Sequence, residues 1–191
     1  MILDNTMAEA MLRAVGERLA SAGATANLVV LGGAAMNLHG FVARPTRDVD
    51  VLARAEVPDG ALRHPEPLPA ALLDAIRQVA VDFNQPPDWM NTAVAQQWLT
   101  GLPPGLEKRV TWREYGALRV GLVAREDLIA FKLYAASDNG PRSVHVSDLL
   151  ALRPSEEELA AAAAWIRTQD TSVEFHAIVE RVIEYVRDHI P

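Results

Sequence analysis

The sequence contains no cysteine, and only two of its 18 basic residues are lysines. The missing thiols exclude disulfides and thiolate metal sites. The start MILDNTMAEA lacks a basic region and a continuous apolar run, and no later stretch approaches the length of a membrane span. We therefore expect a cytoplasmic protein with no membrane partner. The formal net charge of −7 argues against broad nucleic-acid binding, because Lys and Arg supply most of the affinity for a phosphate backbone. Any RNA contact must be local.

The length of 191 residues and the hydrophobic content of 50% are enough for one good core with a helical extension. The succession of expected strands and helices predicts an α/β (α+β) fold, in which a mixed sheet is flanked by helices. We expect a single compact unit over residues 1–191. Within it, an α/β core over 1–124 is followed by a helical C-terminal part over 125–191, packed on the core.

Hydrophobic periodicity and turn residues divide the chain into expected elements. Prolines concentrated between residues 54 and 69 mark an irregular loop, and Ser155 with Glu158 forms a capping box for a late helix. The expected elements are a helix over 5–22, a strand that ends at Gly32 and Gly33, the loop over 54–69, a helix over 72–83, a short helix over 88–99, a two-stranded hairpin over 109–123, and mostly helices from residue 127 onward.

The segment LVVLGGAAMNLHGFVARPTRDVDVL, residues 28–52, carries two motifs close together. In the glycine motif, Gly32 and Gly33, the absence of side chains lets a backbone turn come close to a ligand. The helix that follows directs its free N–H groups at anions. This motif therefore suits the phosphates of a triphosphate, although a pair of glycines after a strand is often an ordinary tight turn.

The second motif is the aspartate pair, Asp48 and Asp50. Alternate residues of a strand share a face, so both carboxylates point the same way, about 6–7 Å apart along the strand. Val49 and Val51 take the opposite face and anchor the strand in a core. The carboxylates then suit one or two Mg²⁺ ions, whose coordination a substrate phosphate completes.

Neither motif is specific alone, because a D-x-D is often a solvated strand edge. Their order and spacing favour function, as do Arg44, Thr46 and Arg47, which lead into the acids and are expected to bind nucleotide.

The pattern GGAAMNLHG followed by RPTRDVDV resembles the nucleotidyltransferase superfamily typified by DNA polymerase β, and specifically its small bacterial branch that includes the AbiEii-type toxins. The resemblance implies that the glycine motif holds the phosphates of an NTP and that the aspartate pair binds Mg²⁺. It implies an enzyme that moves an NMP from the NTP to an acceptor hydroxyl. RNA, plausibly the 3′ end of tRNA, protein and a small molecule stay open as acceptors. The branch also implies a toxin restrained by a cognate antitoxin.

A second constellation lies in REDLIAFKLYAASD, where Lys132 is the only charge in an apolar run. Its ammonium must snorkel to water or enter a polar cavity, and a compact point charge suits phosphate. We expect Lys132→Ala to weaken nucleotide binding and leave the fold intact.

The toxin branch carries an E-D-L-x-x-x-K helix followed by a K-D-x-x-D-like motif, which EDLIAFK and RSVHVSDLL resemble. The resemblance implies that Lys132 neutralises phosphate charge and that Asp148 activates the acceptor or completes the site. Here His145 stands where the first acid of that motif would stand. Three roles stay open for His145: it binds phosphate, it orients Asp148, or it merely packs.

Polymerase-like enzymes carry a third carboxylate on a neighbouring strand, and two residues are candidates for it. Asp82 lies within an apolar triplet, but the helical period around it favours a solvated position. Glu114 is the better candidate if the hairpin continues the sheet beside the aspartate pair. Without a clear third carboxylate, the alternative function is a catalytically degraded nucleotidyltransferase fold that acts as a partner-binding module.

Overall fold

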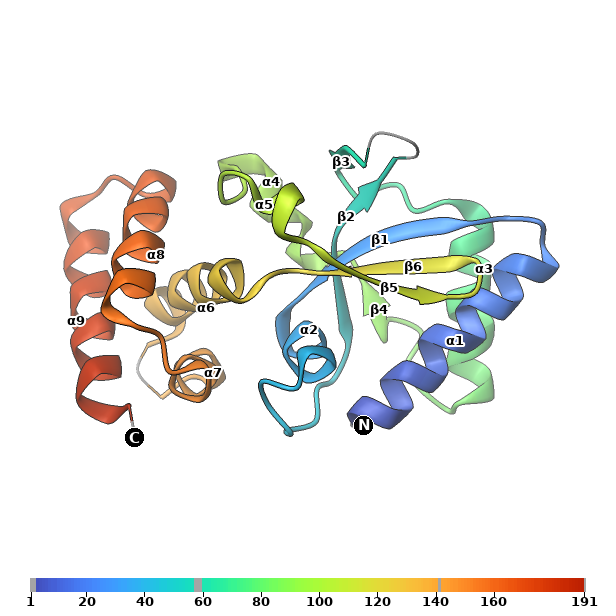
Figure 1. The fold of residues 1–191 in the computed structure, drawn as a ribbon, viewed down its shortest axis with the longest axis horizontal. Helices are drawn as coiled ribbons and strands as arrows, with labels where there is room; N and C mark the ends of the chain where they lie inside the picture. Colours follow the sequence, from blue (N-terminus) through green and yellow to red (C-terminus); the bar gives the residue numbers. More distant parts are fainter. Residues whose placement is uncertain (1–2, 57–59, 141, 191) are drawn as a thin grey trace. The chain divides into compact units, whose positions relative to one another are not determined.

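The computed structural model of the protein describes residues 3–56, 60–140 and 142–190. It has the mixed α/β architecture that the sequence predicts, with a sheet flanked by helices and further helices toward the C-terminus (Figure 1). The chain divides into two compact units. The first comprises residues 1–99 and 105–123, and the second comprises residues 100–104 and 124–191.

The first unit contains a six-stranded sheet. Its strands are β1 (Ala26–Leu31), β2 (Val49–Ala55), β3 (Leu62–Arg63), β4 (Met90–Asn91), β5 (Thr111–Tyr115) and β6 (Leu118–Leu122). The order is β3-β2-β1-β6-β5, and β4 pairs with β2 on the edge that β3 also uses. Strand β1 is antiparallel to β2 and parallel to β6, so the sheet is mixed.

The first unit also contains helices. They are α1 (Asn5–Ser21), α2 (Gly32–His39), α3 (Ala70–Asp82), the 3₁₀ helix η1 (Ala93–Gln96), α4 (Gln97–Thr100), which ends in the second unit, and α5 (Leu106–Arg109). The Asp4 carboxylate caps α1 by accepting a hydrogen bond from the Met7 N–H at 2.8 Å. The apolar side of α1 is buried where the helix packs against α3 and the β5–β6 hairpin. The expected helices over 5–22 and 72–83 and the hairpin are thereby confirmed.

The expected short helix over 88–99 is partly wrong, because the segment begins as strand β4 and becomes helical only at Ala93. Trp89 is fully buried, and its indole N–H donates to the Ile76 carbonyl at 3.1 Å. The adjacent Trp89 carbonyl accepts from the Val49 N–H at 2.7 Å, which places the next two residues beside β2. The expected loop over 54–69 holds the two-residue strand β3, while Pro58 and Asp59 lie outside the described residues.

Neither candidate for a third carboxylate lies beside the aspartate pair. Asp82 ends α3 and forms an exposed ion pair with Arg18, which confirms its solvated position. Glu114 lies on β5, separated from β2 by β6 and β1, and its carboxylate pairs with the Arg119 guanidinium at 2.6 Å. The expectation for Glu114 is wrong because the hairpin adds to the far edge of the sheet.

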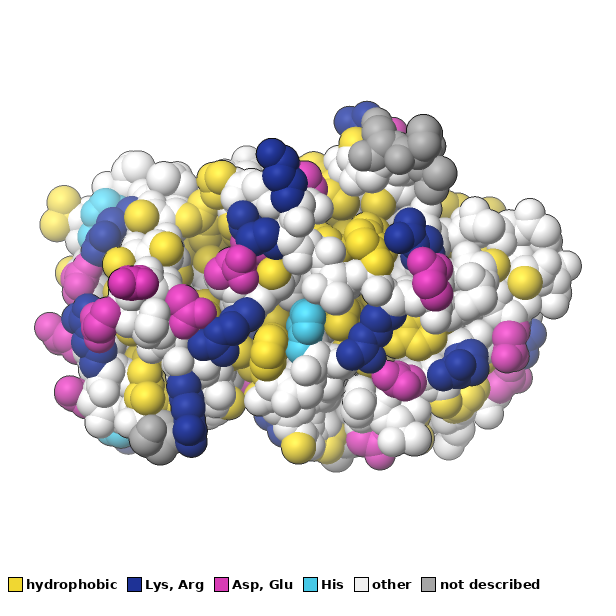
Figure 2. All heavy atoms as spheres, viewed as in Figure 1, with side chains coloured by type: hydrophobic (Ala, Val, Ile, Leu, Met, Phe, Trp, Pro, Cys, Tyr) yellow, Lys and Arg dark blue, Asp and Glu magenta, His cyan; other side chains and the backbone are white. Residues whose placement is uncertain are grey.

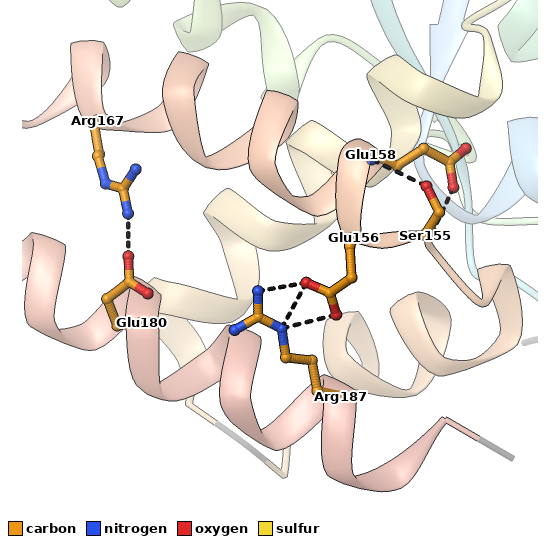
Figure 3. A network of polar contacts seen from close by, with 6 residues as sticks. All are labelled: Ser155, Glu156, Glu158, Arg167, Glu180 and Arg187. Carbon is orange, nitrogen blue, oxygen red and sulfur yellow. Dashed lines mark hydrogen bonds and ion pairs between the residues drawn. The ribbon is translucent and has the colours of Figure 1, made fainter.

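The second unit is helical. Its helices are α6 (Arg125–Asn139), α7 (Val144–Leu152), α8 (Glu156–Gln169) and α9 (Val173–His189). The predicted capping box is present: the Ser155 hydroxyl accepts from the Glu158 N–H, and the Glu158 carboxylate accepts from the Ser155 N–H (Figure 3). Burial alone would raise the pKa of Glu158, but hydrogen bonds from Arg125 and from the Ser155 N–H hold it below its ordinary value. Glu156 of α8 and Arg187 of α9 form an ion pair with N···O distances of 2.5–2.9 Å.

Figure 2 shows the charged side chains on one face of the molecule. On the face drawn in Figure 2, Lys and Arg side chains are interspersed with Asp and Glu instead of forming one continuous basic area. Among the residues that the structure describes, no helix combines the length and the apolar composition needed to cross a lipid bilayer.

Candidate active site

The aspartate pair lies at the start of β2, as the sequence predicts. Val49 and Val51 are fully buried, and Asp48 and Asp50 are partly exposed on the opposite side of the chain. Asp50 is in register with Leu31, the last residue of β1. Because Leu31 directly precedes the glycine motif, this pairing brings the two predicted motifs to the same end of the sheet.

The Asp50 carboxylate packs directly against Gly32, which has a φ of +76°. A Cβ at Gly32 would lie only 2.4 Å from Asp50 Oδ2. Glycine is therefore required here twice, for the left-handed backbone conformation and for the close approach of the carboxylate. Asp50 thus lies at the N-terminal end of α2, where free N–H groups attract negative charge.

Gly33 borders the segment that leads into the aspartate pair. A Cβ at Gly33 would lie 2.7 Å from the Thr46 hydroxyl oxygen and 3.6 Å from Arg44 Nη2. The structure therefore brings Gly33, Arg44 and Thr46 together, as three of the residues predicted to bind nucleotide. Arg47, which is also predicted to bind nucleotide, has an exposed side chain.

Thr46 is held firmly on both sides. Its backbone exchanges hydrogen bonds with buried Leu3, with N···O distances of 2.7 and 2.9 Å. Its hydroxyl donates to the Asp48 carbonyl at 3.4 Å, a long contact. The N-terminal segment therefore fixes the approach to Asp48 before β2 begins.

Side-chain contacts fix the C-terminal end of helix α2. The ring Nε2 of His39 lies 3.1 Å from the Val123 carbonyl, so this nitrogen carries the proton and donates. Burial of the ring, more than the nearby Arg113 charge, lowers the pKa of His39, which favours the neutral imidazole. The Arg113 guanidinium donates to the Leu38 carbonyl and pairs with Glu9 at 2.9 Å. These contacts orient α2 and hence its N-terminal glycines.

Asn91 belongs to the site and was missed in the sequence. It lies on β4 in parallel register with Asp50, and its side-chain Nδ2 donates to Asp48 Oδ2 at 3.3 Å. A strand of two residues shows no alternation of apolar and polar positions, so nothing in the sequence distinguished Asn91 from the helix expected there.

The donor set fits a hard divalent cation that is completed by substrate. Asp48 and Asp50 offer carboxylate oxygens, the ligands that Mg²⁺ prefers, and the absence of a side chain at Gly32 lets the Asp50 carboxylate approach the backbone there. Within residues 3–56, 60–140 and 142–190, no cluster of three or more His, Asp or Glu side chains is arranged to hold a metal. A cation held by these two carboxylates would take its remaining ligands from phosphate oxygens or water.

Substitution of Gly32 tests the contact with Asp50. We expect Gly32→Ala to displace the Asp50 carboxylate and to weaken Mn²⁺ binding about tenfold or more, as loss of a positioned ligand does. Gly40→Ala is the matched control, because Gly40 has a φ of +80° but open space where its Cβ would lie. Equal Mn²⁺ affinity of the two variants in calorimetry would show that the close approach at Gly32 is unimportant.

The other two predicted site residues lie in the second unit and form an ion pair. Lys132 of α6 and Asp148 of α7 are 6% and 1% exposed, and Lys132 Nζ lies 2.8 Å from Asp148 Oδ2. The ammonium therefore does not snorkel to water. Removing it would take this ion-pair partner from a buried carboxylate, so the structure leads us to expect that Lys132→Ala destabilises the fold, unlike the expectation from the sequence. His145 lies one turn before Asp148 on α7.

Comparison with known proteins gives a family. No curated protein and no solved structure shows significant similarity to the chain. One family model matches residues 10–152, a stretch that includes the glycine motif, the aspartate pair, Asn91 and the Lys132–Asp148 pair. Because this match covers well over half of the sequence, the chain belongs to the family described as "Nucleotidyltransferase of unknown function (DUF6036)".

Proposed function

We propose that this protein is a Mg²⁺-dependent enzyme that moves an NMP from an NTP to an acceptor hydroxyl. The observation that carries the proposal is the packing of the Asp50 carboxylate against Gly32, which joins a metal-binding strand to the N-terminus of a helix. Family membership supports the same reaction class. In this reaction the acceptor oxygen attacks the α-phosphorus, the bond to the bridging oxygen breaks, and pyrophosphate and a proton leave.

The residues of the first unit contribute by positioning and electrostatics. The N–H groups at the start of α2, the Thr46 hydroxyl and the Arg44 guanidinium are suited to hold phosphate oxygens. Asp48 and Asp50 would hold Mg²⁺, which when bound supplies Lewis-acid stabilisation of phosphate charge. Roles for Lys132 and Asp148 at the phosphates and the acceptor stay predictions.

Calorimetry tests whether nucleotide binding depends on the metal. The site supplies two carboxylates, so metal and NTP each complete the binding of the other, and we expect NTP affinity to fall when Mg²⁺ is removed or when Asp50 becomes Asn. Titrations of ATP, GTP, CTP and UTP into the parent, with and without Mg²⁺, provide the comparison. The same affinity under all conditions would refute the metal-binding role of the aspartate pair.

The acceptor and the biological role follow from the resemblance to AbiEii-type toxins. We propose RNA, plausibly the 3′ end of tRNA, or a protein as acceptor, and restraint by a cognate antitoxin. The net charge of −7 means that RNA recognition would use the local Arg44 and Arg47 side chains and would be steeply salt-sensitive.

Growth assays test the toxin role. Expression of the parent alone is expected to arrest growth, whereas expression of Asp48→Ala is not, because the second lacks half of the aspartate pair. If both proteins accumulate equally and neither affects growth, the toxin role is refuted while the transfer reaction is still to be measured in vitro.

The alternative is a partner-binding module with a degraded site. Asn91 beside Asp48, where a carboxylate would add a metal ligand, favours this alternative, and so does His145 in place of an acid. Absence of metal-coupled NTP binding together with a stable fold would support the module over the enzyme.

A further inference from the structure

We propose that Asn91 is a positioning residue that holds the Asp48 carboxylate and limits the protein's share of the metal site to two negative charges, which leaves coordination positions for the triphosphate. This inference rests on the proposed function, because it concerns the same metal site. It assigns to Asn91 a role that neither the family description nor the sequence motifs contain.

The place of Asn91 is fixed by the sheet. Strand β4 pairs in parallel with the start of β2, with Val49 opposite Met90 and Asp50 opposite Asn91. The buried Trp89 anchors β4 from the side of α3 through its hydrogen bond to Ile76. Side chains on adjacent strands at this register are close neighbours, so residue 91 necessarily faces the aspartate pair.

The orientation of the Asn91 side-chain amide follows from the hydrogen bonds of its oxygen and its nitrogen. Its oxygen Oδ1 accepts from the Ala93 N–H at 2.9 Å, so this end is already occupied by a donor. Its nitrogen Nδ2 therefore points the other way, and donates to Asp48 Oδ2 and to the Asp88 carbonyl, both at 3.3 Å. An amide held like this acts as a donor to Asp48 and presents no oxygen to a metal.

The identity of residue 91 sets the charge of the site. An aspartate there would place a third carboxylate at the position of the Nδ2 donor, next to Asp48 Oδ2. Without a metal the like charges would repel, and with a metal the third carboxylate would become a ligand. Asparagine does the opposite, because it steadies Asp48 without a metal and leaves coordination positions for the substrate.

The test uses Mn²⁺ alone as a probe, since carboxylate sites that take Mg²⁺ also take Mn²⁺. The variants are Asn91→Asp and Asn91→Ala, with Asn27→Asp as the matched control. Asn27 is also a strand asparagine of the first unit, and its side-chain contact is a long one of 3.5 Å to the Ala55 carbonyl. Mn²⁺ affinity is measured by calorimetry and thermal stability by unfolding with and without Mn²⁺.

Asn91→Asp is expected to lower the melting temperature without metal, to bind Mn²⁺ about tenfold more tightly than the parent and to regain stability when Mn²⁺ is added. Asn91→Ala is expected to bind Mn²⁺ about tenfold more weakly, because Asp48 loses its donor. Asn27→Asp is expected to match the parent in Mn²⁺ affinity.

The proposal would be overturned if the Asn91→Asp variant bound Mn²⁺ no more tightly than the parent. It would also be overturned if the Asn91→Ala variant bound Mn²⁺ with the affinity of the parent. If Asn91→Asp does not fold, the alanine variant alone decides. These readouts do not depend on NMP transfer. A chain that shows this metal pattern but transfers no nucleotide would refute the proposed enzyme and keep the role of Asn91.

Discussion

Replacement of Lys132 by Met is expected to lower the free energy of unfolding by about 3–5 kcal/mol, the usual cost of removing one partner of a buried ion pair. The Asp148 carboxylate is 1% exposed and lies 2.8 Å from Lys132 Nζ. Methionine keeps the length and packing of the lysine stem, so the lost stability reports the charge and not a cavity. Urea unfolding followed by circular dichroism measures the change.

Two further variants separate this effect from others. Lys108→Met removes the only other lysine, whose side chain is exposed, and should change stability by about 0.5 kcal/mol or less. The double variant Lys132→Met with Asp148→Asn removes the uncompensated charge and should recover much of the loss. If Lys132→Met is as stable as the parent, the pair does not contribute to the fold.

Replacement of Asp48 or Asp50 by Asn is expected to lower nucleotidyl transfer by about 10²–10³-fold or more, the range for removal of one preorganised electrostatic group. Both residues are partly exposed, so the fold should persist. The matched control is Asp74→Asn, an exposed aspartate of the first unit that pairs with Arg77 on α3. Transfer that survives both substitutions at the control level would place the chemistry elsewhere.

The site was predictable where local rules decide it. Gly32 and Gly33 follow a buried strand, and alternation along β2 puts Val49 and Val51 in the core and the two aspartates outside. The close approach of Asp50 to Gly32 then follows from antiparallel pairing of β1 with β2.

Long-range pairing decided the rest. Glu114 was a reasonable third carboxylate until strand order placed β5 at the far edge of the sheet, because β6 joins β1 in parallel. Asn91 escaped notice because its strand has only two residues, which Trp89 and backbone pairing with β2 hold in place. The order of strands in a sheet and the position of very short strands depend on packing between residues that are distant in the sequence. Hydrophobic periodicity carries no information on such packing.

The Lys132–Asp148 pair was predictable from the sequence only in part. Lys132 stands out in the sequence as a charge in an apolar helix, and Asp148 follows in the next helix. Their mutual neutralisation depends on how α6 packs on α7 and only the structure shows it. The same observation adds a second prediction for Lys132 beside its role at phosphate, namely that its loss destabilises the second unit.

The most direct measurement of the central claim follows the fate of the two ends of the triphosphate. Purified protein is incubated with Mg²⁺ and cellular RNA or protein, in parallel with NTPs labelled on the α-phosphate or on the γ-phosphate. NMP transfer predicts that the α-label becomes attached to an acceptor while the γ-label is released as pyrophosphate, and that Asp48→Asn does neither. Attachment of the γ-label, or no transfer of either label with any of the four NTPs, would contradict it.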